Sequence, residues 1–451
     1  MHSSNYLVQL NDQVHSEIPE PKIKRFITFL KNFRWDYVDM QELPGFNKFL
    51  NEGVRAKWLN PLFPSLSYPT WTTLSTGLYP ENHGIVGNYI YDPETKDFFT
   101  QDEDQSVAQE KWWSAEPIWI TGTKQGLRTA LILWSQCQVS YDGILPAYCK
   151  PYLVPTIDKP AGLLTLNEDF AEAIDKLEDG YDSVQVYCEQ PDISGHAHGP
   201  DSGELKQTIR QLDEAIMGMM TQLEAKGLDK QVNIVVVSDH GMTDIGVDKA
   251  EHIDLDQYLD ADLVEKITDN GAFFNIKVPN ENIEQVYDQL SLISGADVFR
   301  HDDIPPELHF KNHKYIHDFI IKTKPGYWIS GSQNTAKMLP PDHHTYSGTH
   351  GYDPKLQDMK GIFFAKGPDF GNNKIIEAID VVDVYQVLAH VLQVNPLPHN
   401  GTWSHVEPAL MEGNLVKTVD YVVAAKVITG FVVFLIGAIL YVRKRTKLHH
   451  E

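Results

Sequence analysis

The sequence predicts an α/β fold in which a mostly parallel central sheet carries helices on both faces. From Pro21 to about Asn400, short apolar runs alternate with amphipathic stretches of helical period, a pattern typical of strands connected through helices. Two of the apolar runs are followed at once by Asp and His residues. Open α/β sheets have their active sites at the carboxyl ends of strands, so these residues are candidates for the active site.

The alternation identifies individual strands and helices. The runs predicted to be strands are Arg25–Leu30, Thr129–Trp134, Val184–Cys188, Ile234–Val237 and Gly361–Ala365. The clearest helix is Gly203–Lys226, because its apolar residues recur at spacings of 3 and 4 and Gly227 follows it. A second helix is predicted over Asp380–Leu392. Charged and hairpin-like segments from about Val247 to Ser332 interrupt the alternation, which predicts a small inserted subdomain beside the active site within a catalytic domain of residues 21–405.

The composition excludes one class of function. The chain has 451 residues, of which 42% are hydrophobic and 22% charged, and a formal net charge of -24. Nucleic-acid binding needs basic surface, so no nucleic-acid partner is expected. An acidic balance suits a soluble ectodomain or a site for a cationic group, and for most of these charges solubility alone is a sufficient reason.

The C-terminal sequence predicts a membrane anchor. Residues Tyr421–Val442 are apolar except for Lys426, and at about 1.5 Å per residue such a helix spans about 33 Å, enough for a bilayer. Basic residues in the tail 443–451 predict that this end is cytoplasmic and that the catalytic domain is extracellular, joined by a tether of residues 406–420. This orientation requires a signal peptide, yet Met1–Glu20 is polar and therefore atypical. We expect the N-terminal sequence to be incomplete or altered.

Three features bear on the cellular compartment. Cys137 and Cys149 flank the turn signal Asp142-Gly143, so a disulfide between them would close a short hairpin. Cys188 is expected to be a buried reduced thiol. Asn400 begins an Asn-Gly-Thr sequence, an acceptor for N-glycosylation in a secretory context.

Three distant segments end in residues that bind divalent metals. They are Pro191–His196, Ser238–Gly241 and Thr349–Asp353, and they supply Asp192, His196, Asp239, His240 and His350. A hydrolase with two metal ions normally needs about three protein ligands for each ion. Each His taken alone has a structural explanation, but the joint occurrence at strand ends predicts a two-metal hydrolase.

A further stretch carries a family resemblance. Residues Phe63–Pro80, which include Ser67-Tyr68-Pro69, are followed by His83–Asn88. Together with the three metal motifs, this stretch resembles the ectonucleotide pyrophosphatase/phosphodiesterase family of the alkaline phosphatase superfamily, over about Phe33 to Trp403. The resemblance implies an alkaline-phosphatase-like fold and two Zn²⁺ ions.

The resemblance also assigns roles to residues. It implies that Ser67 is the nucleophile and, with Asp239 and His240, binds one zinc, whereas Asp192, His196 and His350 bind the other. It implies that Asn88 donates to a phosphate oxygen. Without the resemblance, Ser65 and several neighbouring threonines are as good candidates for the nucleophile as Ser67. A hydroxyl nucleophile is weak until a metal lowers its pKa.

Within the family, the segment around Ser67 looks most like the branch that cleaves glycerophosphocholine. Cys137 and Cys149 also resemble that branch, and Tyr187 matches an aromatic position of its choline pocket, where cation–π contact would hold the ammonium group. A core position for Tyr187 is an equal alternative. The expected activity is zinc-dependent hydrolysis of choline phosphodiesters, such as glycerophosphocholine or lysophosphatidylcholine, to phosphocholine through a phosphoserine. The alternative within the class is a nucleotide phosphodiesterase.

One residue departs from the family pattern. The family opens its sheet with Asp-Gly-Phe-Arg, whose Asp is a zinc ligand, and here Lys31 stands in place of that Asp. A missing carboxylate and an added ammonium both disfavour a metal ion, so weak zinc binding near Ser67 and slow turnover are expected. An altered first exon would explain both Lys31 and the polar N-terminus. The alternative is an inactive family member that acts as an interaction ectodomain.

Overall fold

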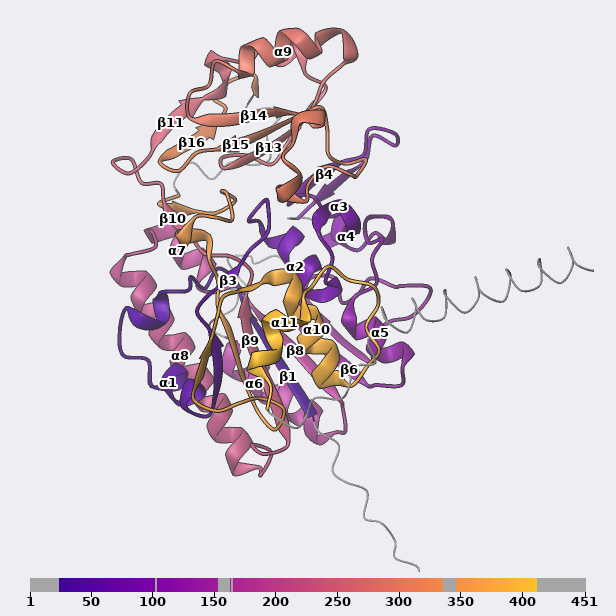
Figure 1. Cartoon of the computed structure of the whole chain (residues 1–451), viewed down its shortest axis with the longest axis vertical. Helices are drawn as coiled ribbons and strands as arrows, with labels where there is room; N and C mark the ends of the chain where they lie inside the picture. Colours follow the sequence, from indigo (N-terminus) through magenta and orange to yellow (C-terminus); the bar gives the residue numbers. More distant parts are fainter. Residues whose placement is uncertain (1–23, 102–103, 153–162, 164, 336–345, 412–451) are drawn as a thin grey trace, which may run out of the picture.

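The computed structural model describes residues 24–101, 104–152, 163, 165–335 and 346–411. Its centre is an eight-stranded sheet (Figure 1) with the strand order β19-β2-β18-β9-β1-β8-β6-β7. In that order the strands are Lys374–Ile376, Gly53–Ala56, Phe363–Lys366, Val232–Ser238, Lys24–Leu30, Ser183–Cys188, Thr129–Trp134 and Tyr148–Pro151. All neighbours run parallel except that β18 is antiparallel to both β2 and β9. The predicted mostly parallel α/β sheet is confirmed.

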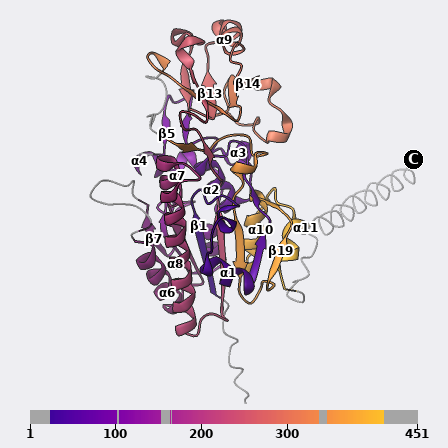
Figure 2. The same ribbon diagram turned by 90° about the vertical axis from the view of Figure 1, so that its left-hand side faces the viewer.

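Helices cover both faces of this sheet, as predicted (Figure 2). One face packs against α1 (Pro44–Asn51), α6 (Leu166–Glu178) and α8 (Gly203–Ala225). The other face packs against α2 (Ser67–Thr76), α5 (Ile118–Lys124) and α10 (Val381–Leu392). The helix predicted at Gly203–Lys226 is α8, whose apolar side chains are buried because they recur on one side of the helix. The α10 helix begins after Asp380, which forms a capping box with Asp383.

The region predicted as an insert contains a second sheet, with its own apolar core (Figure 1). Its strand order is β12-β13-β15-β14, all antiparallel, and α9 packs against it. These elements are Lys266–Thr268, Phe273–Lys277, Phe319–Thr323, Ala296–Arg300 and, for α9, Ile283–Leu290. A parallel pair beside them joins β11 (Glu251–Asp254) to β16 (Tyr327–Ser330).

The remaining strand pairs and α-helices are short. The strand pairs are β3 (Leu59–Asn60) with β20 (Ile379–Asp380), β4 (Tyr89–Tyr91) with β5 (Phe98–Thr100), and β10 (Thr243–Asp244) with β17 (Gly348–Thr349). The remaining helices are α3 (Pro80–His83), α4 (Asp104–Val107), α7 (Asp192–His198) and α11 (Trp403–Val406).

The predicted membrane-spanning segment 421–442 lies outside the described residues. Within the described part of the chain, no helix is both long and apolar enough to cross a bilayer.

Candidate functional site

The site lies where the three central strands β1, β8 and β9 end together. The register pairs Leu30 of β1 with Cys188 of β8 and with Ser238 of β9. The next residue of each strand therefore enters one shared region, and these residues are Lys31, Glu189 and Asp239. Parallel strands have their carboxyl ends at one edge of the sheet. The residues that follow β1, β8 and β9 therefore meet there, although they are far apart in the sequence.

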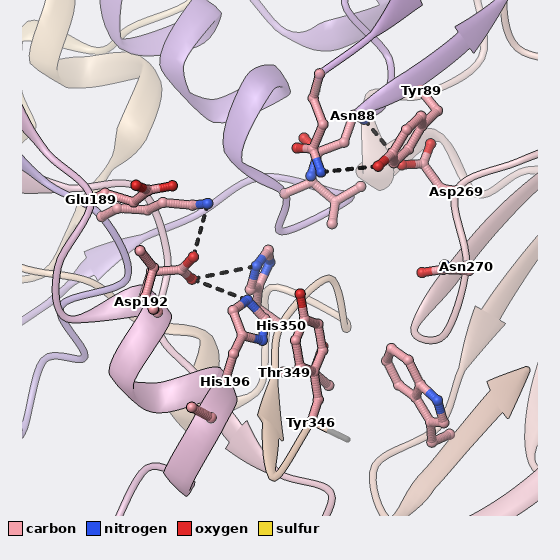
Figure 3. A pocket seen from close by; sticks show the side chains of 16 residues that line it. Asn88, Tyr89, Glu189, Asp192, His196, Asp269, Asn270, Tyr346, Thr349 and His350 are labelled. Atoms are coloured by element: carbon pink, nitrogen blue, oxygen red, sulfur yellow. Dashed lines mark hydrogen bonds and ion pairs between the residues drawn. The ribbon is translucent and has the colours of Figure 1, made fainter. Parts of the chain in front are cut away.

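One group of side chains converges as a metal ligand set would. Asp192 begins α7, His196 lies one turn later, and His350 follows β17. Their ligand atoms all lie within 4.8 Å of one another. Asp192 Oδ1 is 3.3 Å from Nε2 of His196 and 3.7 Å from Nε2 of His350, and Figure 3 shows both rings directed at this carboxylate.

Backbone carbonyls orient both imidazoles of this group. His196 Nδ1 is 2.8 Å from the carbonyl oxygen of Gly348, and His350 Nδ1 is 3.1 Å from that of Ser65. A proton on each Nδ1 satisfies these carbonyls and leaves each Nε2 lone pair directed at Asp192, which is the arrangement that metal-binding histidines use. Burial and the neighbouring His240 lower the pKa of His350 well below its ordinary value, so this ring is neutral at neutral pH.

The second predicted ligand group is more crowded. Ser67, the first residue of α2, is fully buried, and its Oγ is 3.3 Å from His240 Nε2. Asp239 Oδ1 accepts hydrogen bonds from the backbone N–H groups of Asn32 (2.8 Å) and His240 (3.0 Å). Asp239 Oδ2 accepts a third from Trp71 Nε1 at 2.9 Å. Protein donors therefore already bond to both oxygens of this carboxylate.

Lys31 reaches into the same region. Its Nζ forms an ion pair with Asp192 Oδ2 at 2.8 Å, and its side chain is only 14% exposed. Burial would raise the pKa of Asp192, but the Lys31 ammonium and His196 hold that pKa well below its ordinary value. Asp192 is thus ionised, with one oxygen paired to Lys31 and the other facing the two histidines.

These contacts test whether the site fits metal ions. Asp192, His196 and His350 offer one carboxylate oxygen and two imidazole nitrogens, which suit a divalent ion with open positions for substrate. At the second group, the carboxylate that the family pattern requires is replaced by Lys31. Only one of the two predicted ligand sets therefore fits a metal ion.

A cavity of about 350 Å³ opens beside the first group. It is lined by Lys31, Leu66, Asn88, Tyr89, Gln101, Glu189, Asp192, Ile193, His196, Ala197, Asp269, Asn270, Trp328, Tyr346, Thr349 and His350. Asn88 Oδ1 accepts the backbone N–H of Tyr68 at 3.0 Å, which ties Asn88 to the first turn of α2. The cavity thus has Asn88, the Asp192 group and Leu66, the residue just before α2, around one volume.

Ser67, Asp239 and His240 are not among the residues that line this cavity, and neither are Tyr187, Cys137, Cys149 and Asn400. Tyr187 is 3% exposed and packs edge-on against Trp71 and Tyr152, so its ring belongs to the apolar core rather than to the cavity lining. The strand period puts it there, because Tyr187 faces the helices on that side of the sheet.

The predicted disulfide between Cys137 and Cys149 is present. Asn400 is exposed and accepts the backbone N–H of Tyr79.

Sequence reasoning predicted that the inserted region lies beside the active site but did not identify its residues that line the cavity. Asp269 and Trp328 of the insert line it, as does Tyr346 beyond the insert, and Asp269 Oδ1 accepts the backbone N–H of Asn88 at 3.0 Å (Figure 3). The only local signal was the turn sequence Asp269-Asn270-Gly271. The positive φ of 58° at Asp269 follows from that turn, but the sequence does not reveal which segment the turn approaches.

Comparisons with known proteins agree with this geometry. The sequence profile of the family described as type I phosphodiesterase / nucleotide pyrophosphatase matches residues 30–353. Ectonucleotide pyrophosphatase/phosphodiesterase family member 5 of Homo sapiens is 30% identical over 418 residues, covering 91% of this chain and 82% of that protein. The bis(5'-adenosyl)-triphosphatase of Mus musculus is 29% identical over 425 residues, covering 92% and 87%.

A solved structure is similar over most of the chain. It is the murine family member 5, an inactive threonine-to-alanine variant in complex with AMP. The match has a TM-score of 0.78 at 30% identity and covers 86% of this chain and 100% of that one. The predicted alkaline-phosphatase-like architecture of the catalytic domain is consistent with this match.

Proposed function

Because this chain belongs to the type I phosphodiesterase / nucleotide pyrophosphatase family, we propose that it hydrolyses phosphate diesters or anhydrides of nucleotides in the cavity beside Asp192. The enzyme class, a phosphoric diester hydrolase, follows from the family. The observation that carries the proposal is the convergence of Asp192, His196 and His350 next to Asn88 and the start of α2. Zinc is the proposed ion, since carboxylate and imidazole are its usual ligands.

The chain's own residues supply the steps of the proposed reaction. Asp192, His196 and His350 would hold the divalent ion, which when bound stabilises negative charge on the phosphoryl group. Ser67 Oγ forms the bond to phosphorus, the bond from phosphorus to the leaving oxygen breaks, and the leaving group departs with the proton that the serine gives up. Water then adds to the phosphoserine and frees Ser67. In this proposal the side-chain amide of Asn88, which is bonded to the first turn of α2, donates to a phosphate oxygen.

The substrate class rests on the relatives and on the cavity wall. The similar murine structure contains AMP, and a curated relative is a bis(5'-adenosyl)-triphosphatase. In this chain, the rings of Tyr89, Trp328 and Tyr346 line the cavity and offer flat surfaces for a nucleobase. Tyr346 is itself stacked on His196 at 4.3 Å between ring centroids, which places an aromatic surface next to the candidate metal ligands.

A choline phosphodiester is the second candidate. Glu189 lines the cavity together with the same aromatic rings, and a carboxylate beside aromatic faces suits a quaternary ammonium group. The two candidates differ in one assay. We expect a higher kcat/KM for p-nitrophenyl-TMP than for p-nitrophenyl-phosphorylcholine, and the opposite ranking would assign the enzyme to choline esters.

The nucleophile is tested by Ser67→Ala. We expect turnover to fall by several orders of magnitude, because a covalent nucleophile is lost, with little change in thermal stability. Ser75→Ala is the matched control, since Ser75 is equally buried on the same helix and its Oγ only donates to the Thr72 carbonyl. Near-normal activity in Ser67→Ala would exclude Ser67 and point to Ser65 or to direct attack by water.

We also propose that the catalytic domain is extracellular and that residues 421–442 anchor it in the cell membrane. The Cys137–Cys149 disulfide supports an oxidising compartment, and the exposed Asn400 is accessible for glycosylation. Glycosidase treatment of the full chain, expressed behind a signal peptide, should shift its gel mobility, and Asn400→Gln should abolish the shift. An unshifted full chain would contradict the orientation.

A further inference from the structure

The Lys31 ammonium lies among the side chains that the family pattern assigns to two metal ions. Lys31 is the residue after β1, and its Nζ forms an ion pair with Asp192 Oδ2 at 2.8 Å. The same nitrogen is 5.8 Å from the centroid of the Trp71 ring, and Trp71 donates to Asp239. A tethered cation thus lies close to both predicted ligand groups.

The surroundings keep this ammonium charged. Its Nζ lies 2.8 Å from Asp192 Oδ2, and the two side chains are only 14% and 3% exposed. Removing one member of a buried ion pair leaves the other charge without compensation, which is strongly unfavourable. Lys31 is therefore a fixed positive charge of the site.

The second ligand group has little left to offer a metal ion. Asp239 accepts hydrogen bonds on both oxygens, from Asn32, His240 and Trp71. Beside one remaining lone pair on Asp239 Oδ2, the ligands would be His240 Nε2 and the Ser67 hydroxyl, which lie 3.3 Å apart. A dication entering there would find one carboxylate fewer than the family pattern provides and the like charge of Lys31 nearby.

The two carboxylate oxygens of Asp192 face two different cation positions. Its Oδ2 is bound by the ammonium, while its Oδ1 faces Nε2 of His196 and of His350 and accepts the Asn32 side-chain amide at 3.0 Å. One oxygen is thus available to a metal ion that the two histidines share, and the other is neutralised by the chain itself.

We infer that this centre binds one divalent ion, at Asp192, His196 and His350, and that the Lys31 ammonium provides the second positive charge in place of a second ion. The inference rests on the metal-binding part of the proposed function. Lys31 lines the cavity, so its ammonium is also placed to bind a phosphate oxygen of the substrate.

Metal stoichiometry tests this inference without reference to turnover. The full chain, expressed behind a signal peptide, is stripped with chelator and titrated with Zn²⁺ by calorimetry, and bound zinc is measured by elemental analysis. We expect one zinc per chain for the unmodified protein and two for Lys31→Asp, which restores a carboxylate and removes the ammonium. Lys31→Met is the control, because it removes the charge without adding a ligand, and it should bind one zinc more tightly.

Two results would overturn the inference. One is two zinc ions of comparable affinity in the unmodified chain, a measurement that does not depend on any variant folding. The other is a folded Lys31→Asp variant, with unchanged circular dichroism, that still binds one zinc. Two ions together with hydrolysis would refute only this inference, whereas one ion without hydrolysis of either ester would refute only the proposed function.

Discussion

His83 gives the catalytic domain a calculable sensitivity to acid. Burial, followed by the neighbouring His313, lowers the pKa of His83 from 6.5 to about 3. The ring is fully buried, and its two nitrogens have fixed roles. Nδ1 accepts the backbone N–H of Ile85, and Nε2 donates to Thr73 Oγ1, whose own proton goes to the Leu78 carbonyl. A proton on Nδ1 would face the N–H of Ile85, so the folded chain excludes it.

The sign and size of the effect follow from linkage. Between pH 6.5 and 3 the unfolded chain binds a proton at this residue and the folded chain does not, so stability is complete above pH 6.5 and declines as the pH falls. Each pH unit corresponds to about 1.36 kcal/mol. At pH 4.5, two units below the unfolded value, His83 should therefore cost about 2.7 kcal/mol of the free energy of unfolding.

Comparison of the unmodified chain with a His83 variant separates the contribution of His83 to acid sensitivity from those of the other histidines. Urea unfolding is followed at pH 7.5 and 4.5, with chelator present, for the unmodified chain and for His83→Gln. Glutamine retains an acceptor and a donor but does not titrate. The loss of stability on acidification should be smaller in the variant by about 2.7 kcal/mol. Equal losses in the two proteins would refute the neutral, buried state of His83.

Two further perturbations address the scaffold of the site. Trp71→Phe removes the indole donor to Asp239 while keeping most of the ring volume. The loss of a hydrogen bond to a buried carboxylate should lower the free energy of unfolding, measured by urea titration, by about 1.5–3 kcal/mol. A change below about 0.5 kcal/mol would show that the contact contributes little. Replacing Cys137 and Cys149 by Ala opens a loop with a sequence separation of 12 and should cost about 3 kcal/mol on the loop-entropy account. The unmodified chain under reducing conditions should show a comparable loss, and no loss in either sample would mean that the disulfide does not stabilise the fold.

The local patterns of the sequence determined the elements of the central sheet. Each of the five predicted strands lies in that sheet, and α8 and α10 lie where helices were predicted. These elements are predictable because a strand buried on both faces is a continuous apolar run, whereas a helix buried on one side has an apolar period of about 3.6. The Asp and His residues after β8 and β9 were predictable for the same reason, since a strand's end is visible in its own sequence.

The pairing of elements was decided only by the tertiary structure. The sequence of β18 does not state that it runs antiparallel to β9, because a buried strand has the same apolar composition in either direction. Lys31 meets Asp192 because Leu30 pairs with Cys188 and with Ser238 in one register, a relation among three segments that no local pattern contains. Tyr187 was equally suited to a pocket wall and to a core, and the packing of α2 against its strand buried it. The candidate metal ligands within a single segment could thus be predicted from the sequence. The contact partners and burial of a side chain could not, because they depend on residues far apart in the chain.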